Sequence, residues 1–232
     1  MDTKKRNIII GAAAAGVAVI LLVVIAIFGM FRGFNPQKYV NAMLDQTFKG
    51  KVEVAAEMTK GIDEAQLYAQ YETGIQSFAK QSIANGVAMD KELEDKYVAL
   101  CKKIFADMKY SVKDDKKTKD GGYEVTVQYQ KSDVMQRFVK AAASLTQELE
   151  GKVKTGDSEY RGLLEEINEQ MNRDFVVQAY PLLEEAYKKM EYGEKATYVF
   201  HVTKGENDLY KMDSQEITEF LKKILDLDEK QD

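Results

Sequence analysis

The segment GGYEVTVQY, residues 121–129, decides the fold class because a turn signal is followed by strict alternation of apolar and polar residues. Paired glycines favour a tight turn, and a period of two places every apolar side chain on one face of a strand. That face carries Tyr123, Val125, Val127 and Tyr129. Tyr110 and Val112, which precede the turn, supply the partner strand. The segment therefore predicts a β-hairpin with one buried face.

A second hairpin is predicted near the C-terminus, with strands at residues 195–203 and 209–212. Its turn, Gly-Glu-Asn-Asp at residues 205–208, has a composition that favours chain reversal. Similar runs precede the two hairpins, KKIFADMKY at 102–110 and EAYKKMEY at 185–192. Either an internal repeat or chance similarity between helix ends explains these runs, and we favour chance because few residues match.

The remaining apolar residues recur at helical spacing, so helices surround the hairpins. Asn35 and Asp90 are typical of helix starts, and Asp213 with Glu216 predicts a capping box. The expected helices cover residues 36–49, 68–84, 91–108, 132–150, 158–190 and 214–225, and at 51–58 a short helix is favoured over a strand. Pro181 is expected to kink or split the fifth of these helices, since proline lacks a backbone donor.

Residues 8–31 read IIIGAAAAGVAVILLVVIAIFGMF, which contains no charged side chain. At about 1.5 Å per helical residue this segment is long enough to cross a hydrocarbon core of roughly 30 Å. Secretory signals also follow basic residues such as Lys4, Lys5 and Arg6, but their apolar cores are only about 7 to 15 residues long. No small-residue cleavage pattern follows, and the only cysteine, Cys101, cannot accept a lipid there. The segment predicts an uncleaved transmembrane helix.

Positive charges orient this helix, since three precede it whereas Arg32 and Lys38 follow it. We expect a cytoplasmic N-terminus and an extracytoplasmic domain at the cell membrane. The expected parts are a cytoplasmic tail at 1–7, a transmembrane signal-anchor helix at 8–31, a linker at 32–35, an extracytoplasmic domain at 36–227 and an acidic tail at 228–232. The fold class is α+β: an N-terminal transmembrane helix, then one domain of amphipathic helices packed on two short antiparallel β-hairpins.

The charge balance argues against a nucleic-acid partner. The formal net charge of the chain is −5. Without Lys4, Lys5, Arg6, Arg32 and Asp2, 29 of the 33 basic and 37 of the 38 acidic residues remain, which gives the rest of the chain a charge of −8. An acidic domain binds nucleic acid poorly because phosphate contacts require lysine and arginine. Small residues four apart in the anchor, Ala12 and Gly16, leave a homo-oligomer open.

Few residues suited to catalysis are present. The chain has one histidine, His201, within an aromatic strand, and one cysteine, Cys101, on the apolar face of a helix. One of each cannot build a zinc site, and the chain has no phosphate-binding loop, dinucleotide fingerprint or nucleophile elbow. Carboxylate clusters such as 165–169 and 184–185 lie opposite the apolar stripes of their helices. We therefore expect no cofactor and no metal.

Tyrosines are the most suggestive residues, because several elements supply them at or near inward positions. A buried tyrosine hydroxyl needs a hydrogen-bond partner, which a ligand can provide. The candidate ligand pocket consists of Tyr68, Tyr71, Tyr97, Tyr110, Tyr123 and Tyr198. The alternative is a core whose tyrosines direct their hydroxyls to the rim, and we favour this alternative.

Several motifs after the anchor resemble an uncharacterised family, a domain of unknown function, of membrane-anchored or lipid-anchored extracytoplasmic domains from low-GC Gram-positive bacteria. The motifs are YVNAMLDQTFKGK at 39–51, YETGIQSFAK at 71–80, MKYSVKDD at 108–115, GGYEVTVQY at 121–129, EEINEQ at 165–170 and EYGEKATYVFHVTK at 191–204. They are patterns of core and turn residues. The resemblance implies topology and location, and it supplies no catalytic residues.

The sequence favours a non-catalytic domain that binds a small ligand, a peptide or an envelope protein close to the bilayer, as a sensor or an accessory subunit. A structural subunit that oligomerises through its anchor is the second hypothesis. A carboxylate-based hydrolase of envelope polymers is the third. A preformed pocket would favour the first, an exposed apolar helix patch the second, and two facing carboxylates with one raised pKa the third.

Overall fold

The computed structural model describes residues 34–59, 62–155, 164–205 and 209–227 of the chain. These residues form an α+β fold with seven α-helices, one π-helical segment and four strands. In chain order the elements are α2 (Pro36–Lys49), α3 (Glu53–Met58), α4 (Glu64–Ser77), η2 (Phe78–Ile83), α5 (Lys91–Ala106), β1 (Tyr110–Lys117), β2 (Tyr123–Ser132), α6 (Val134–Thr155), α7 (Leu164–Lys188), β3 (Tyr192–Lys204), β4 (Tyr210–Met212) and α8 (Ser214–Ile224).

The expected fold class, an N-terminal transmembrane helix followed by amphipathic helices packed on two short antiparallel β-hairpins, is wrong about the strands, because all four form one antiparallel sheet in the order β1-β2-β3-β4. The first hairpin joins the second through β2 and β3, which pair from Tyr123 opposite Val202 to Ser132 opposite Tyr192. A two-stranded hairpin leaves a row of unpaired backbone groups on each edge. Pairing of β2 with β3 satisfies the inner edges of both hairpins and creates a broader apolar face.

The predicted cytoplasmic tail (1–7), transmembrane helix (8–31) and acidic tail (228–232) lie outside the described residues. Within the described ranges, no helix combines the length and the apolar character needed to cross a bilayer.

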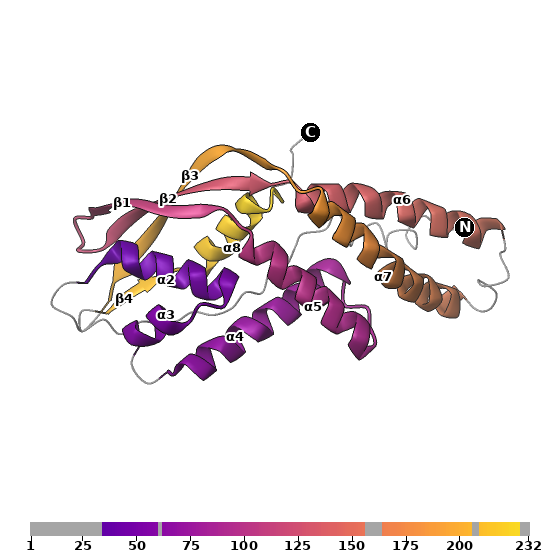
Figure 1. The fold of residues 1–232 in the computed structure, drawn as a ribbon, viewed down its shortest axis with the longest axis horizontal. Coiled ribbons are helices and arrows are strands. Elements are labelled where there is room, and N and C mark those ends of the chain that lie inside the picture. Colours follow the sequence, from indigo (N-terminus) through magenta and orange to yellow (C-terminus); the bar gives the residue numbers. More distant parts are fainter. Residues whose placement is uncertain (1–33, 60–61, 156–163, 206–208, 228–232) are drawn as a thin grey trace.

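Helices cover one face of the sheet, with α2 against β1 and β2 and α8 against β2 (Figure 1). The core lies between these layers and includes Val125 and Val127 of β2, Phe200 of β3 and Phe220 of α8, all without exposed surface. Figure 1 shows no helix of the described chain over the opposite face of the sheet. On β3 that face is solvent-exposed at Thr197 and the other odd-numbered residues up to Thr203. The sheet therefore has a packed inner face and an open outer face.

Helix starts follow the sequence signals closely. The side chain of Asn35 accepts a hydrogen bond from the Lys38 amide at 2.8 Å, and Gly50 ends α2 in the left-handed region at φ 64°. Asp90 likewise accepts from the Leu93 amide at 2.8 Å. Residues 53–58 are helical, so the choice of helix for this ambiguous segment is confirmed.

Two expectations for the helices need correction. Helix α7 is continuous through Pro181, so the proline does not split it. Asp213 caps α8 by accepting from the Gln215 amide at 2.9 Å, but the predicted reciprocal contact from Glu216 is absent. Instead, the Glu216 carboxylate accepts from the backbone amide of His201 at 2.9 Å. The pairing of β3 with β4 begins at Val202, so β4 does not occupy the His201 amide, and this amide donates to Glu216 of α8.

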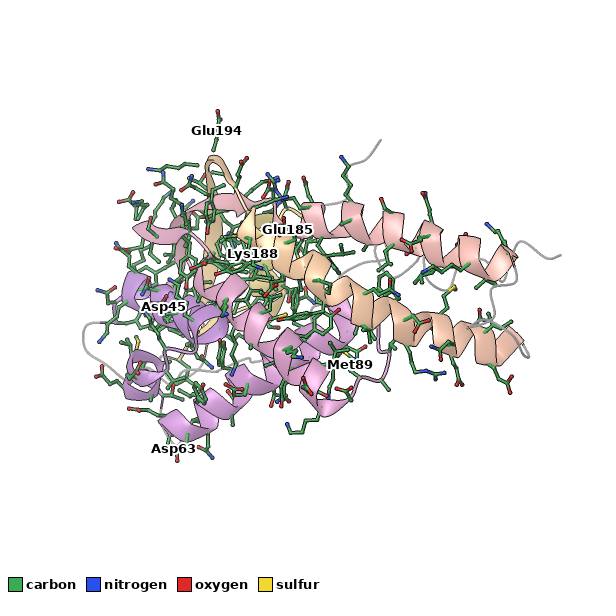
Figure 2. All side chains as sticks on the ribbon, turned by 45° about the vertical axis from the view of Figure 1, so that its right-hand side comes forward. Asp45, Asp63, Met89, Glu185, Lys188 and Glu194 are labelled. Carbon is green, nitrogen blue, oxygen red and sulfur yellow. The ribbon has the colours of Figure 1, made fainter. Side chains whose placement is uncertain are left out.

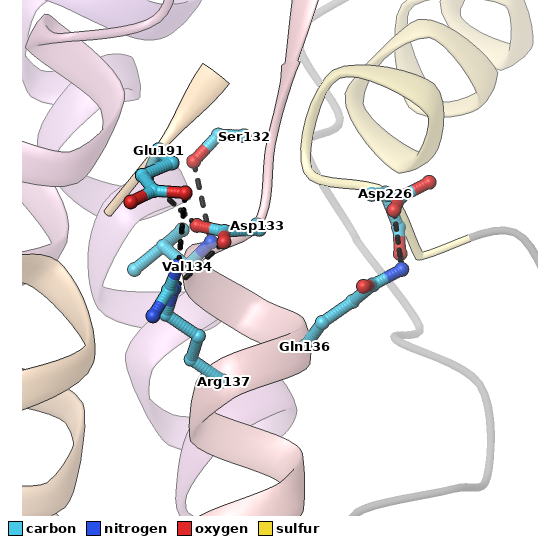
Figure 3. Close-up of polar contacts among 7 residues, drawn as sticks. All are labelled: Ser132, Asp133, Val134, Gln136, Arg137, Glu191 and Asp226. Atoms are coloured by element: carbon cyan, nitrogen blue, oxygen red, sulfur yellow. Dashed lines mark hydrogen bonds and ion pairs between the residues drawn. The ribbon is translucent and has the colours of Figure 1, made fainter. Parts of the chain in front are cut away.

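Helices α6 and α7 form an antiparallel hairpin that extends away from the sheet (Figures 1 and 2). Its two ends are joined at Asp133, whose carboxylate accepts from the Glu191 amide at 2.8 Å and from Arg137 Nε at 2.7 Å (Figure 3). The Asp226 carboxylate next to α8 accepts from Lys131 Nζ at 2.7 Å and also contacts Gln136. These contacts fix the hairpin to the sheet and to the end of α8.

Candidate functional site

A pocket lies where β1, β2 and β3 run side by side, and its volume is about 290 Å³. This is close to the lower end of small-ligand sites, which span roughly 300 to 1,000 Å³. Its lining consists of Met108, Lys109, Tyr110, Ser111, Lys113, Gln128, Tyr129, Gln130 and Lys195, and we call it the lysine pocket. The charged lining is entirely cationic.

Strand register brings the polar side chains of the pocket together. Ser111 of β1 lies opposite Gln128 of β2, and Gln128 lies opposite Thr197 of β3. Gln130 lies opposite Lys195 on the same pair of strands. Because side chains two residues apart share a face, these groups all belong to the outer face, whereas Tyr129 lies on the inner face and is 5% exposed. The pocket thus depends on the pairing of β2 with β3.

A bulge adds Lys113 to this set. The β1–β2 register shifts between Val112 and Asp114, which leaves Lys113 without a partner residue on β2. A bulged residue bends its strand and changes the direction of its side chain. Lys113 is exposed and lines the pocket.

Lys109 is held by an aromatic ring at the beginning of β3. Its ammonium nitrogen lies 3.7 Å from the centroid of the Tyr192 ring, within the range of a cation–π contact. The Tyr192 hydroxyl donates to the backbone carbonyl of Asp107 at 2.7 Å, and the Tyr187 hydroxyl donates to the Asp107 carboxylate at 2.6 Å. This hydrogen bond, with burial and the carboxylate charge, raises the pKa of Tyr187 to about 12. The segment before β1 is therefore fixed to both ends of the α7–β3 connection.

The lysines of the pocket have no acidic partner in the described part of the chain. No carboxylate there lies within 4.0 Å of the ammonium groups of Lys109, Lys113 or Lys195. By contrast, the lysines of α5, α6 and α7 commonly pair with a carboxylate one turn away, as Lys188 does with Glu184 at 2.9 Å. The pocket is a local concentration of positive charge on a chain whose net charge is −5.

Three of the predicted pocket tyrosines lie in the helical layer. Tyr68 and Tyr71 are neighbours on α4, with ring centroids 5.7 Å apart, but Tyr68 is 46% exposed. Burial, more than the adjacent Glu72 charge, raises the pKa of Tyr71 to about 12. Tyr97 is fully buried on α5, where its hydroxyl donates to the Val176 carbonyl of α7 at 2.6 Å. Tyr97 therefore joins two helices and has its hydrogen bond within the protein.

The other three predicted tyrosines lie on the sheet. The Tyr110 hydroxyl donates to Asp45 Oδ1 at 2.7 Å, and burial together with this carboxylate raises the pKa of Tyr110. Tyr198 donates to Glu219 Oε2 at 3.2 Å. Tyr123 lies at the opposite end of β2 from the lysine pocket. Of the six tyrosines, the lysine pocket includes Tyr110 alone.

The two residues considered for nucleophilic chemistry have separate environments. Cys101 is buried on α5, and desolvation raises the pKa of its thiol to about 12. His201 Nδ1 lies 2.5 Å from Glu216 Oε1 on the exposed outer face of β3. Within the described ranges, no group of three histidine, cysteine or acidic residues is arranged to hold a metal ion.

The described carboxylates that depart from their usual pKa all depart downward. At Glu72, burial acts to raise the pKa, but hydrogen bonds from Lys102 and Tyr68 and the Lys102 charge outweigh it and lower the pKa. The hydrogen bond from Lys189 lowers the pKa of Glu185, and that from Thr118 lowers the pKa of Asp120. A general acid requires the opposite shift.

Sequence reasoning missed the lysine pocket because its residues come from both hairpins. The three lysines of the pocket are exposed, and more than eighty positions of sequence separate Lys109 from Lys195. No local pattern therefore connects them. The usable signal was the polar outer row of β2, which contains Gln128 and Gln130. It becomes informative only once β2 is known to pair with β3.

Comparison with known proteins adds a distant structural similarity. No family model matches the chain, and no curated protein matches it. The chain is similar to the crystal structure of a "putative lipoprotein (ycdA)" from Bacillus subtilis, with 21% sequence identity and a TM-score of 0.46. The similarity covers 82% of this chain and 55% of the other, so the chain spans about half the length of that neighbour.

Proposed function

We propose that this protein is a non-catalytic binding domain, attached to the outer face of the cell membrane, that takes a small ligand in the lysine pocket. The observation that carries the proposal is the pocket itself, a concavity of about 290 Å³ in which side chains of three strands converge. Polar groups placed on rigid strands are the usual means of orienting a small ligand. Membrane attachment rests on the apolar segment 8–31.

In the proposed arrangement, the end of the sheet next to Phe34 faces the membrane. The Phe34 ring stacks on Tyr210 of β4 with centroids 3.9 Å apart and planes 6° apart, and it also lies 5.8 Å from Tyr123 of β2. Three Cα steps separate Phe34 from the end of the apolar segment, a reach of at most about 11 Å. Tyr129, in the pocket, is six residues from Tyr123, or about 20 Å along the strand. The pocket is thus at the far end of the sheet from the attachment.

The competing hypotheses receive less support from the described residues. The exposed large hydrophobic residues are Val54, Tyr68, Val177 and Val199, and each lies on a different element. Scattered residues of this kind are ordinary on a protein surface, whereas an oligomerising or accessory subunit favours a contiguous patch. A hydrolase would favour a carboxyl group with a raised pKa, whereas the pKa values of Glu72, Asp120 and Glu185 are lowered.

A stability screen of the full chain in non-ionic detergent tests the proposal. The probes are neutral sugars, amino acids, dipeptides, nucleosides and phosphate esters, and the measurement is the rise in unfolding temperature. Gln128→Trp fills the pocket from a strand position where an aromatic residue is well tolerated. Val199→Trp is its control, on the same open face and 40% exposed, but outside the lining.

We expect at least one probe class to stabilise the wild type and the Val199→Trp variant while leaving the Gln128→Trp variant unchanged. Stabilisation that persists in the filled pocket would contradict the proposal, as would a screen in which no probe class raises the unfolding temperature.

A further inference from the structure

We propose that the lysine pocket binds the phosphate group of a soluble phosphate ester. This inference rests on the proposed function and names the ligand chemistry of the same site. The phosphate assignment rests on three lysines that line one pocket and have no acidic partner in the described chain. They are Lys109, Lys113 and Lys195.

Three acidic side chains of the adjoining segments are engaged elsewhere, those of Asp107, Asp115 and Glu191. The Asp107 carboxylate accepts from Tyr187, and Asp115 accepts from Gln37 at 2.7 Å. Glu191 pairs with Arg137 at 3.4 Å, as Figure 3 shows. Glu194, beside Lys195 in sequence, extends away from the body of the molecule in Figure 2. Asp114 follows Lys113 and lies opposite Thr126 on the outer face, but its carboxylate is more than 4.0 Å from the three pocket ammonium groups. None of these carboxylates therefore forms an ion pair with a lysine of the pocket.

One of the three ammonium groups is positioned before any ligand arrives. Lys109 lies over the Tyr192 ring, which is itself anchored through its hydroxyl to Asp107. A lysine side chain held in this way loses less conformational freedom on binding than a free one. The cation–π contact leaves the ammonium hydrogens that point away from the ring available to an anion.

The chemistry of the lining favours phosphate over a single carboxylate. The pocket contains no arginine, the residue whose planar fork matches a carboxylate with two parallel hydrogen bonds. Ammonium groups act as point charges, and three of them suit a tetrahedral dianion that presents oxygens in several directions. The Ser111 hydroxyl and the Gln128 amide have no hydrogen-bond partner within the described ranges. They can bind the hydroxyl groups of the esterified alcohol.

The position of the pocket favours a soluble ester over a lipid headgroup of the same membrane. The chain enters the sheet at Phe34, beside Tyr123 and Tyr210, whereas Tyr110 and Tyr129 mark the other end. The separation of about 20 Å along β2 exceeds the Debye length of about 8 Å at physiological ionic strength. The proposal takes β2 to stand along the membrane normal, an arrangement in which headgroups beneath the attachment point are too far away to occupy the pocket.

The test uses the full chain in non-ionic detergent, with glycerol 3-phosphate as the probe and glycerol as the neutral control. Binding is measured by phosphorus NMR of the probe and by titration calorimetry. Lys113→Gln and Lys195→Gln each remove one positive charge, and Lys113→Arg restores it. Lys116→Gln is the matched control, because Lys116 lies on the same strand and is exposed but is outside the lining.

We expect glycerol 3-phosphate to bind and glycerol not to bind. Each glutamine variant should weaken binding about two- to fivefold, as for an exposed charge pair, and the double variant about tenfold. Lys113→Arg should retain most of the affinity, Lys116→Gln should leave it unchanged, and added salt should weaken it. Equal weakening by Lys116→Gln would overturn the assignment, since any lysine would then serve.

A lipid arm separates the two sources of phosphate. The chain in nanodiscs of phosphatidylglycerol should bind glycerol 3-phosphate as well as it does in nanodiscs of phosphatidylcholine. Loss of binding only in the anionic nanodiscs would show that lipid headgroups occupy the pocket and would overturn the choice of a soluble ester. If a neutral probe binds in the pocket and no phosphate does, the phosphate inference fails while the proposed function stands.

Discussion

Substitution of Tyr39 by phenylalanine tests how the helical layer holds the end of the sheet. Tyr39 lies on α2 without exposed surface, and its hydroxyl accepts a hydrogen bond from the backbone amide of Met212 in β4 at 3.1 Å. Burial raises the pKa of this tyrosine to about 12, so its hydroxyl stays neutral at ordinary pH. Tyr39→Phe removes the acceptor and leaves a buried backbone donor without a partner.

The expected loss of folding free energy depends on whether the remaining partner is left without any hydrogen bond. An orphaned buried donor costs about 1–3 kcal/mol of folding free energy, more than the net value of a hydrogen bond, about 0.5–1.5 kcal/mol. Tyr97→Phe is the comparison, because its acceptor, the Val176 carbonyl inside α7, keeps a second lone pair for its own helix. We therefore expect Tyr39→Phe to destabilise the protein more than Tyr97→Phe.

Urea unfolding of the full chain in non-ionic detergent, followed by far-ultraviolet circular dichroism, measures both variants. An unchanged dependence of the unfolding free energy on urea would show that each substitution alters stability and not the extent of unfolding. A loss of folding free energy in Tyr39→Phe that is no larger than the loss in Tyr97→Phe would contradict the assigned role of the Tyr39 hydroxyl.

Three further predictions concern the sheet and its junctions. Gly122→Ala should destabilise by about 1–3 kcal/mol, because its new Cβ would lie 2.5 Å from a backbone carbonyl oxygen of β3, whereas Gly193→Ala, with 3.9 Å of clearance, should not. Urea unfolding distinguishes them, and equal stability would contradict the account. Asp133→Ala should cost about 1–2 kcal/mol and speed hydrogen exchange at the Glu191 amide, which loses its acceptor; unchanged exchange would argue against this role. Stability should fall as pH rises from 10 through 12, because buried tyrosines such as Tyr39 bind their protons more tightly when folded than when unfolded. Unfolding midpoints that stay constant between pH 10 and 12 would contradict the raised pKa of the buried tyrosines.

Local sequence signals predicted the individual elements well. The caps at Asn35 and Asp90 formed as expected, and the alternation from Tyr123 to Tyr129 marked the buried face of β2. Such signals act over a few residues, so they are present before any tertiary contact forms. Elements of this kind can be derived from one sequence.

Long-range pairing could not be derived in the same way. Alternation tells which residues share a face but not which strand lies next to it, so the join between β2 and β3 was missed. Glu216 shows the same limit, because the sequence predicts a local cap whereas the folded chain offers the His201 amide. The candidate site depends on that join, and the six predicted tyrosines instead found partners within separate parts of the core and surface.

Amide chemical-shift mapping shows where a phosphate ester binds on the protein. Glycerol 3-phosphate is added to the isotopically labelled full chain in non-ionic detergent, and shifts are followed residue by residue. We expect the amide signals of the pocket to shift together with one saturation curve, while the signal of Tyr123 at the opposite end of the sheet stays unchanged. The pocket residues followed are Ser111, Lys113, Gln128, Gln130 and Lys195. Saturable shifts that map to another surface, or no saturable shift in these residues, would contradict phosphate binding in the pocket.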